Sequence, residues 1–231
     1  MEFCKTSVSL LFPICHKVLV AYIMAFVGKV EEMFENKTNT GVCIAFDIGN
    51  VCIAISTERC QDATGIPADL PEWCQLCQSL EWGRISTEDF LSKAERLVPP
   101  GHHLDGGMLE AFNAKILQPI QGMEELLKTL ANKGVQPVFF SDISQMHLDR
   151  FRQRFSDAAK YPGIYSFEVG AWKPSPSMFF AFEERYGAPL LYVDDRQELI
   201  DAAIAYGWKN SICFRGAKSL EQNISRLISV M

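Results

Sequence analysis

The ten residues from Val42 to Val51, which read Val-Cys-Ile-Ala-Phe-Asp-Ile-Gly-Asn-Val, decide the fold of this chain. Five apolar or small residues lead into Asp47, and the turn pair Gly49-Asn50 follows. An unbroken apolar run that ends at a turn is typical of a strand buried on both faces, as in a parallel sheet. Asp47 would then lie at the carboxyl end of the strand, where open α/β sheets bind ligands. There it could be a metal ligand, a nucleophile or both, or it could only cap the following turn.

Four more apolar runs follow in the second half of the chain, and each is separated from the next by a helical pattern. Alternation of strand and helix predicts an α/β fold in which a doubly wound parallel sheet is covered on both faces. The expected strands are Val135–Phe140, Ile164–Val169, Pro189–Val193 and Ser211–Phe214. The expected helices are Met123–Lys133, Gln145–Phe155, Pro176–Tyr186, Leu199–Tyr206 and Ser219–Ile228.

The stretch between the first two strands has a helical pattern and no strand signal. Apolar spacing predicts helices over Leu70–Trp82 and Met108–Leu117, and Ser86 begins another with a capping box. The short run after Val51 suggests a hairpin or turn beyond the first strand. We therefore expect an N-terminal extension at 1–40, an α/β core at 41–56 and 119–231, and an inserted helical cap at 57–118. His147, on the helix after the second strand, is expected at the surface.

Composition limits the partners and the compartment. The net charge of −6 and the pI near 5.3 argue against nucleic acid as a partner, because binding its backbone requires a basic face. Eight cysteines, several within apolar runs, indicate a reducing cytoplasm rather than a disulfide framework. Lys5 and the apolar run Ser7–Cys15 resemble a weak signal peptide, without a convincing cleavage site. The apolar run after Lys17 is too short to span a membrane, so a membrane partner is not expected.

Polar residues follow the predicted strands directly. Asp47, Ser141 and the pair Asp194-Asp195 each come at a strand end, and Lys173 lies in a loop before a helix. Taken singly, these could be turn or capping residues and a solvated lysine. Together they place acids, a hydroxyl and a cation on one edge of one sheet. Clustered acids repel, and a divalent cation removes the repulsion; hard oxygen ligands suit Mg²⁺.

Four motifs in this order resemble those of the haloacid dehalogenase-like (HAD) phosphohydrolase superfamily. They are Phe46–Val51, Phe140–Asp142, Gly170–Pro174 and Val193–Asp195. The resemblance covers residues 42–225 and implies a Rossmann-like core with a small helical cap at the position of the predicted insert. The Asp-x-Gly-Asn form of the first motif is similar to the subgroup that includes bacterial α-glucose-1-phosphate phosphatase.

The resemblance implies a role for each of these acids. Asp47 would attack the phosphorus of the substrate and form an aspartyl-phosphate. Mg²⁺ would be held by Asp47, the backbone carbonyl of Gly49, and Asp195. Asp194 would orient the water molecules on the metal.

The remaining motif residues would bind the phosphoryl group of a small phosphorylated metabolite. Ser141 and the backbone N–H of Asp142 would bind phosphate oxygens. Lys173 would neutralise charge on Asp47 and on the phosphoryl group during transfer.

One position departs from the family pattern. Most phosphatases of this superfamily carry a second aspartate two residues after the nucleophile, and here that residue is Gly49. Glycine cannot transfer a proton, so we expect substrates whose leaving group needs little help, such as anomeric sugar phosphates or acyl phosphates, unless a substrate hydroxyl or a cap residue supplies the proton. Asp142 and Glu198, where asparagine is frequent in the family, add negative charge.

Two alternatives follow from these departures and from the family's range of chemistry. One is a catalytically weak phosphate-binding or interaction protein. The other is a haloacid dehalogenase, a reaction that needs no metal and therefore gives the pair Asp194-Asp195 no cation to bind.

Overall fold

The computed structural model describes residues 41–228. The expected extension and weak signal peptide at 1–40 lie outside the described residues. Five parallel strands form the main sheet in the order β5-β4-β1-β6-β7, which confirms the predicted α/β class. The strands are β1 (Cys43–Phe46), β4 (Gln136–Ser141), β5 (Gly163–Tyr165), β6 (Leu191–Asp194) and β7 (Ser211–Cys213).

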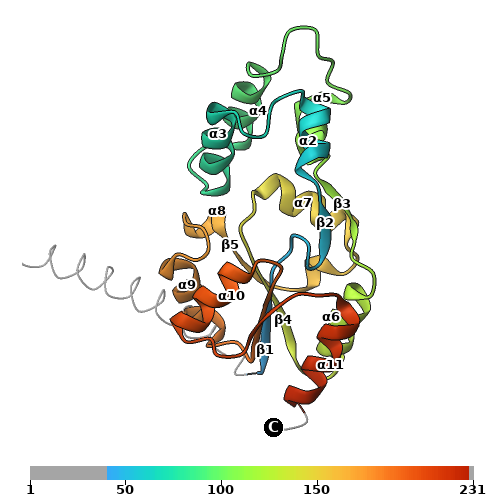
Figure 1. Cartoon of the computed structure of the whole chain (residues 1–231), viewed down its shortest axis with the longest axis vertical. Helices are drawn as coiled ribbons and strands as arrows, with labels where there is room; N and C mark the ends of the chain where they lie inside the picture. The colour runs from blue at the N-terminus through green and yellow to red at the C-terminus, as the bar shows by residue number, and fades with distance from the viewer. Residues whose placement is uncertain (1–40, 229–231) are drawn as a thin grey trace, which may run out of the picture. The chain divides into compact units, whose positions relative to one another are not determined.

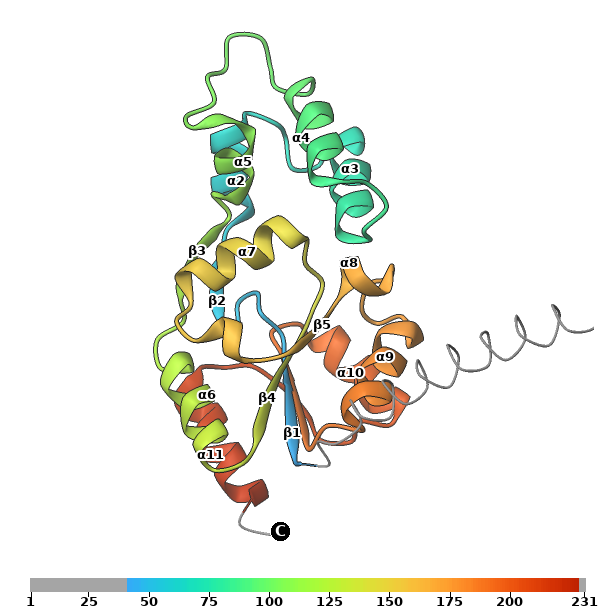
Figure 2. The same cartoon turned by 180° about the vertical axis from the view of Figure 1, so that it is seen from behind.

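Helices cover both faces of this sheet. Ile44 and Phe46 of β1 face one apolar cluster, and Cys43 and Ala45 face another, because side chains alternate along a strand. The first cluster includes α6 (Met123–Asn132), α7 (Gln145–Arg154) and α11 (Ala217–Ile228). The second includes α9 (Pro176–Tyr186) and α10 (Gln197–Tyr206). Figures 1 and 2 show α6 with α11 and α9 with α10 on opposite sides of β1 and β4. The sheet is therefore doubly wound, as predicted.

Helices α2 (Thr57–Thr64), α3 (Pro71–Glu81), α4 (Thr87–Glu95) and α5 (Gly107–Asn113) follow β1 and have an apolar cluster of their own. The rings of Trp73, Phe90 and Phe112 pack there, with centroids 4.5–5.8 Å apart. The Ser86 hydroxyl caps α4 by accepting a hydrogen bond from Asp89 N, as the sequence predicted. Among the described residues, no helix is both long and apolar enough to cross a membrane.

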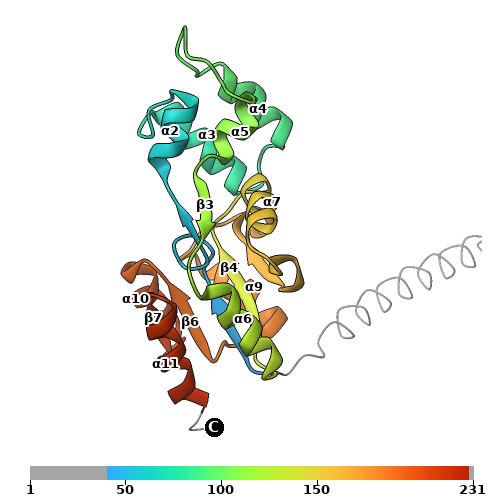
Figure 3. The ribbon, with the colours of Figure 1, turned by 90° about the vertical axis from the view of Figure 1, so that its right-hand side faces the viewer.

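Two short strands join these four helices to the core. β2 (Ile53–Ile55) and β3 (Ile116–Pro119) pair antiparallel. Figure 3 shows β3 between the helices α2 and α5 and the core. The predicted helix Met108–Leu117 was therefore wrong at its end. Of the two alternatives for the run after Val51, the structure has the turn, at residues 50–52, and the strand after it pairs with β3. Three or four residues are too few to show a strand period, and only the pairing partner stabilises them.

Two further expectations were wrong. The predicted strand Ile164–Val169 ends at Tyr165, and α8 (Ser166–Val169) follows it. A 3₁₀ turn at Ala158–Lys160 lies before β5. The Ser166 hydroxyl bonds both Ile143 N, at 2.9 Å, and Ile143 O, at 3.1 Å, which turns the chain out of the sheet. His147 is buried, with 1% of its surface exposed, because its ring stacks on Phe112 of α5 at 4.2 Å.

Candidate active site

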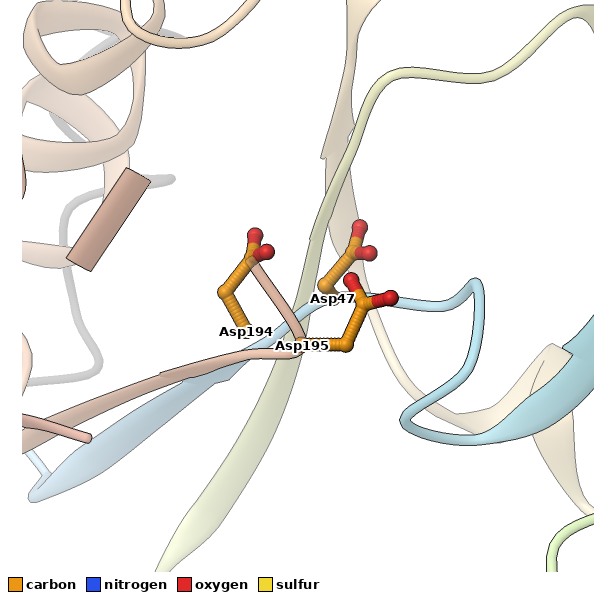
Figure 4. Close-up of side chains that lie close together, drawn as sticks. All are labelled: Asp47, Asp194 and Asp195. Carbon is orange, nitrogen blue, oxygen red and sulfur yellow. The ribbon is translucent and has the colours of Figure 1, made fainter. Parts of the chain in front are cut away.

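Three aspartates meet where β1 and β6 end. Asp47 follows β1, Asp194 is the last residue of β6, and Asp195 comes next. The two strands are hydrogen-bonded neighbours, and Asp47 N donates to Val193 O at 2.9 Å. One carboxylate oxygen from each aspartate lies within 4.8 Å of the others (Figure 4). The sequence separation of Asp47 from the other two is therefore bridged by strand pairing.

Lys173 contacts two of these acids from the loop between α8 and α9. Its Nζ donates to Asp47 Oδ1 at 2.9 Å, to Asp194 Oδ2 at 2.7 Å and to Phe140 O at 3.0 Å. Burial disfavours its charge, but the neighbouring Asp47, Tyr192 and Asp194 outweigh this and raise the pKa of Lys173. Lys173 is thus a permanent cation that links the first and fourth motifs.

The ionisation of Asp47 is finely balanced. The pKa of Asp47 is raised to about 6, mainly by burial and also by the neighbouring Asp194. Lys173 and the Ser141 side chain act in the opposite direction, because both favour the carboxylate form. A further cation beside Asp47 would favour the ionised form in the same way.

The two neighbouring acids at the end of β6 have different surroundings. Asp194 is fully buried; its Oδ2 accepts from Lys173 and the Tyr192 hydroxyl, and its Oδ1 accepts from Arg196 N at 3.0 Å. Burial opposes its ionisation, but these donors lower the pKa of Asp194. Asp195 is partly exposed and accepts one side-chain hydrogen bond, from Asn50 Nδ2 at 3.1 Å. Asp195 therefore has more capacity left for a ligand than Asp194.

The turn after Asp47 contributes Gly49 and Asn50 to the wall of the site. Asn50 has a left-handed backbone, with φ of 51°, and its Oδ1 accepts from Ile55 N at 3.2 Å. Asn50 thus joins the first strand of the connection, β2, to the Asp195 carboxylate. At Gly49 a Cβ atom would lie 3.3 Å from Ile55 Cδ1, so β2 also approaches this position closely.

Arg196 is one of two cations of the site that sequence reasoning missed, the other being Lys115. The Arg196 Nη2 lies 3.3 Å from Asp142 Oδ2 and its Nε lies 3.9 Å from Glu198. Asp142 Oδ1 also accepts from Lys173 N at 2.9 Å. The negative charge expected from Asp142 and Glu198 is therefore partly compensated. The only sequence signal was that Arg196 directly follows the acidic pair; its approach to Asp142 depends on β6 and β4 ending at the same edge.

A cavity of about 340 Å³ opens over this edge. It brings together every predicted site residue except the buried Asp194, namely Asp47, Gly49, Ser141, Asp142, Lys173 and Asp195. Glu81 at the end of α3, Lys115 just before β3, Trp172 and Arg196 also line it. Residues of both the core and the inserted helices thus line one cavity, and the sequence analysis predicted only the lining residues of the core.

Comparison with solved structures identifies the fold. A HAD family enzyme from Bacteroides thetaiotaomicron has a TM-score of 0.65 at 19% identity, over 76% of this chain and 95% of that chain. The same protein was also solved in complex with magnesium and inorganic phosphate. A HAD-like family hydrolase from Porphyromonas gingivalis has a TM-score of 0.66 at 22% identity, over 82% of this chain and 98% of that chain.

A more distant structure has a different activity. A 2-haloacid dehalogenase from Pseudomonas syringae has a TM-score of 0.51 at 14% identity, over 75% of this chain and 86% of that chain. Comparison by sequence found no matching family model and no matching curated protein. At these identities the likeness shows that the chain has the HAD-like fold, and the chemistry must be argued from the site.

Proposed function

We propose that this protein is a Mg²⁺-dependent phosphatase that hydrolyses a small phosphorylated metabolite through an aspartyl-phosphate. The observation that carries the proposal is the Asp47 carboxylate, held 2.9 Å from Lys173 and opening with Asp195 into one cavity. The magnesium and phosphate complex of the Bacteroides enzyme, which shares the fold, supports it.

The acids of the site suit a hard divalent cation. Five carboxyl groups and three cationic side chains gather here, so negative charge is in excess. We propose Asp47, the Gly49 carbonyl and Asp195 as the ligands, with the buried Asp194 acting through Lys173 and the water around the ion. When bound, Mg²⁺ would stabilise the negative charge of the transferring phosphoryl group.

The residues of the chain would perform the transfer in two steps. An oxygen of Asp47 attacks the phosphorus, and the bond to the leaving oxygen breaks; water then releases inorganic phosphate from Asp47. Lys173 holds Asp47 in position and offsets its charge. Ser141 and the backbone N–H of Asp142 would bind phosphate oxygens, which orients the phosphorus toward Asp47.

The helices α2–α5 are proposed as the cap of the site. Glu81 and Lys115 from this side of the cavity would contact the part of the substrate that departs, and closure would exclude water. Gly49 offers no proton, so the proton for the leaving oxygen would come from a cap residue or from the substrate. We propose that leaving groups that are easily displaced are preferred, in particular an anomeric sugar phosphate, in keeping with the similarity to the glucose phosphate phosphatase subgroup. Equal rates on an anomeric sugar phosphate and on a simple alkyl phosphate would contradict this substrate preference.

Two other functions make different predictions. A catalytically weak phosphate-binding or interaction protein is suggested by Gly49 and Asp142. A dehalogenase would release halide without Mg²⁺, and the excess of acid at Asp195 and Asp194 argues against it.

The deciding experiment measures phosphate release from para-nitrophenyl phosphate, with and without Mg²⁺. Wild-type protein should turn over only with the metal, and Asp47→Asn should abolish both turnover and phosphate trapping on the protein. Asp201→Asn, a change at an exposed aspartate of α10, is the matched control and should behave as wild type. Phosphate binding without turnover, or activity that survives Asp47→Asn, would overturn the proposal.

A further inference from the structure

Proton transfer to the leaving oxygen has no donor at Gly49. A Cβ atom at this position would lie 3.3 Å from Ile55 Cδ1, so a side chain there would require Ile55 to shift slightly. If the proposed phosphatase function holds, the proton must come from elsewhere on the cavity wall or from the substrate.

Most carboxyl groups of the cavity are already engaged. Asp47 pairs with Lys173, Asp142 accepts from Lys173 N and Arg196, and Asp195 accepts from Asn50. Among the described residues lining this cavity, only the Glu81 carboxyl forms neither an ion pair nor a side-chain hydrogen bond of normal geometry. Glu81 is the last residue of α3 and lines the cavity.

The chain after Glu81 holds it against the core. The Trp82 ring lies 5.2 Å from the Trp172 ring of the core loop. Gly83 approaches the core so closely that a Cβ atom there would lie 2.2 Å from Phe167 O, and its φ is +63°. The end of α3 is thus seated on the core beside α8, which places Glu81 at the wall of the cavity.

The surroundings of Glu81 suit a group that gives up and takes back a proton. Burial raises its pKa; Lys115 lowers it and Asp142 raises it, and the net shift is upward. Arg196 and the buried indole N–H of Trp172 favour the ionised form, although the indole does not reach hydrogen-bond geometry. Cys77, one turn earlier on α3, is the remaining titratable neighbour. Burial and Asp142 thus favour the protonated form of Glu81, and Lys115 and Arg196 favour the carboxylate, so the site has groups that stabilise each form.

We propose that Glu81 is the general acid and base of this site, in place of the missing aspartate at position 49. In the first step the bond from phosphorus to the leaving oxygen breaks, and that oxygen takes the Glu81 proton. In the second step the Glu81 carboxylate removes a proton from water as the water oxygen bonds to phosphorus. The bond from phosphorus to Asp47 then breaks, and Glu81 is again protonated. Trp172 lines the same cavity, and its buried N–H has no partner among the described residues, so it is available to a group of the substrate.

The test compares Glu81→Gln with wild type on two probes in the presence of Mg²⁺. Para-nitrophenyl phosphate has a leaving group that needs no proton, and glycerol phosphate has one that does. Glu81→Gln should lower kcat/KM on glycerol phosphate by about 10²–10⁴-fold. On para-nitrophenyl phosphate it should keep a burst of nitrophenolate at the wild-type rate, followed by slower turnover, because only the water step then lacks its base.

Two controls keep the outcomes separate. Glu72→Gln changes an exposed glutamate on the first turn of the same helix and should leave both substrates unaffected. The burst itself shows that Glu81→Gln is folded and forms the phosphoenzyme. If the wild type is active, equal losses of kcat/KM on the two probes, or no loss of kcat/KM on glycerol phosphate, would overturn the role of Glu81. Absence of Asp47-dependent turnover in the wild type would instead overturn the proposed phosphatase function.

Discussion

Replacing Lys173 with methionine tests the electrostatic centre of the site. Methionine fills a similar volume but leaves Asp47 and Asp194 without the cation that lies 2.9 and 2.7 Å from them. The Lys173 side chain is 1% exposed and that of Asp194 is 0% exposed, so water cannot replace the lost partner. Removing one member of a buried ion pair costs about 3–5 kcal/mol. For a protein of this size, that loss lowers Tm by roughly 6–20 °C.

The assay is a double-mutant cycle on the free energy of unfolding, measured by urea at neutral pH without Mg²⁺. Lys173→Met should be strongly destabilised, and Lys173→Met with Asp194→Asn should recover part of the loss, because the second change removes a stranded charge. Activity with Mg²⁺ should be lost in both variants, because Asp47 then lacks the Lys173 ammonium that holds it in position. If the double variant is as unstable as the sum of the single variants, Lys173 and Asp194 are not coupled and the reasoning is wrong.

Three further changes probe the surroundings of the site. Burial keeps the pKa of His147 in the folded protein well below the value of 6.5 that applies in the unfolded chain. The free energy of unfolding should therefore fall as the pH drops below 6.5, and His147 should contribute at most about 1.4 kcal/mol per pH unit to this fall. His147→Gln should flatten the slope measured by urea titrations, and an unchanged slope would contradict the assignment. Gly83→Ala should raise KM, because its Cβ would push the proposed cap away from Phe167 O. Gly101 also has a positive φ, +84°, but a Cβ there would meet nothing within 4 Å, so Gly101→Ala introduces the backbone strain alone and should leave KM unchanged. Asn50→Gly accepts the same φ but loses the bond to Asp195, so Mg²⁺ affinity measured by calorimetry should fall about 10–100-fold; an unchanged affinity would place the metal elsewhere.

The sequence alone determined the sheet and the acids that end its strands. The runs before Asp47, Ser141 and Asp194 are apolar because their strands are buried on both faces, and this signal does not depend on the partner. The same property located the edge at which those polar residues meet, since parallel strands end on one side of the sheet. The sequence also predicted the start of α4 at Ser86, because the capping contact is local: the Ser86 hydroxyl accepts from the backbone N–H three residues ahead.

Tertiary structure alone decided which groups complete the site. Glu81 and Arg196 read as ordinary surface charges, and only the packing of α3 on the core and the neighbouring ends of β4 and β6 bring them to the cavity. His147 reads as polar but is buried, since a ring of another helix stacks on it. β3 is a strand because β2 lies beside it. In each case the deciding contact joins residues far apart in the chain, and such contacts leave no local pattern in the sequence.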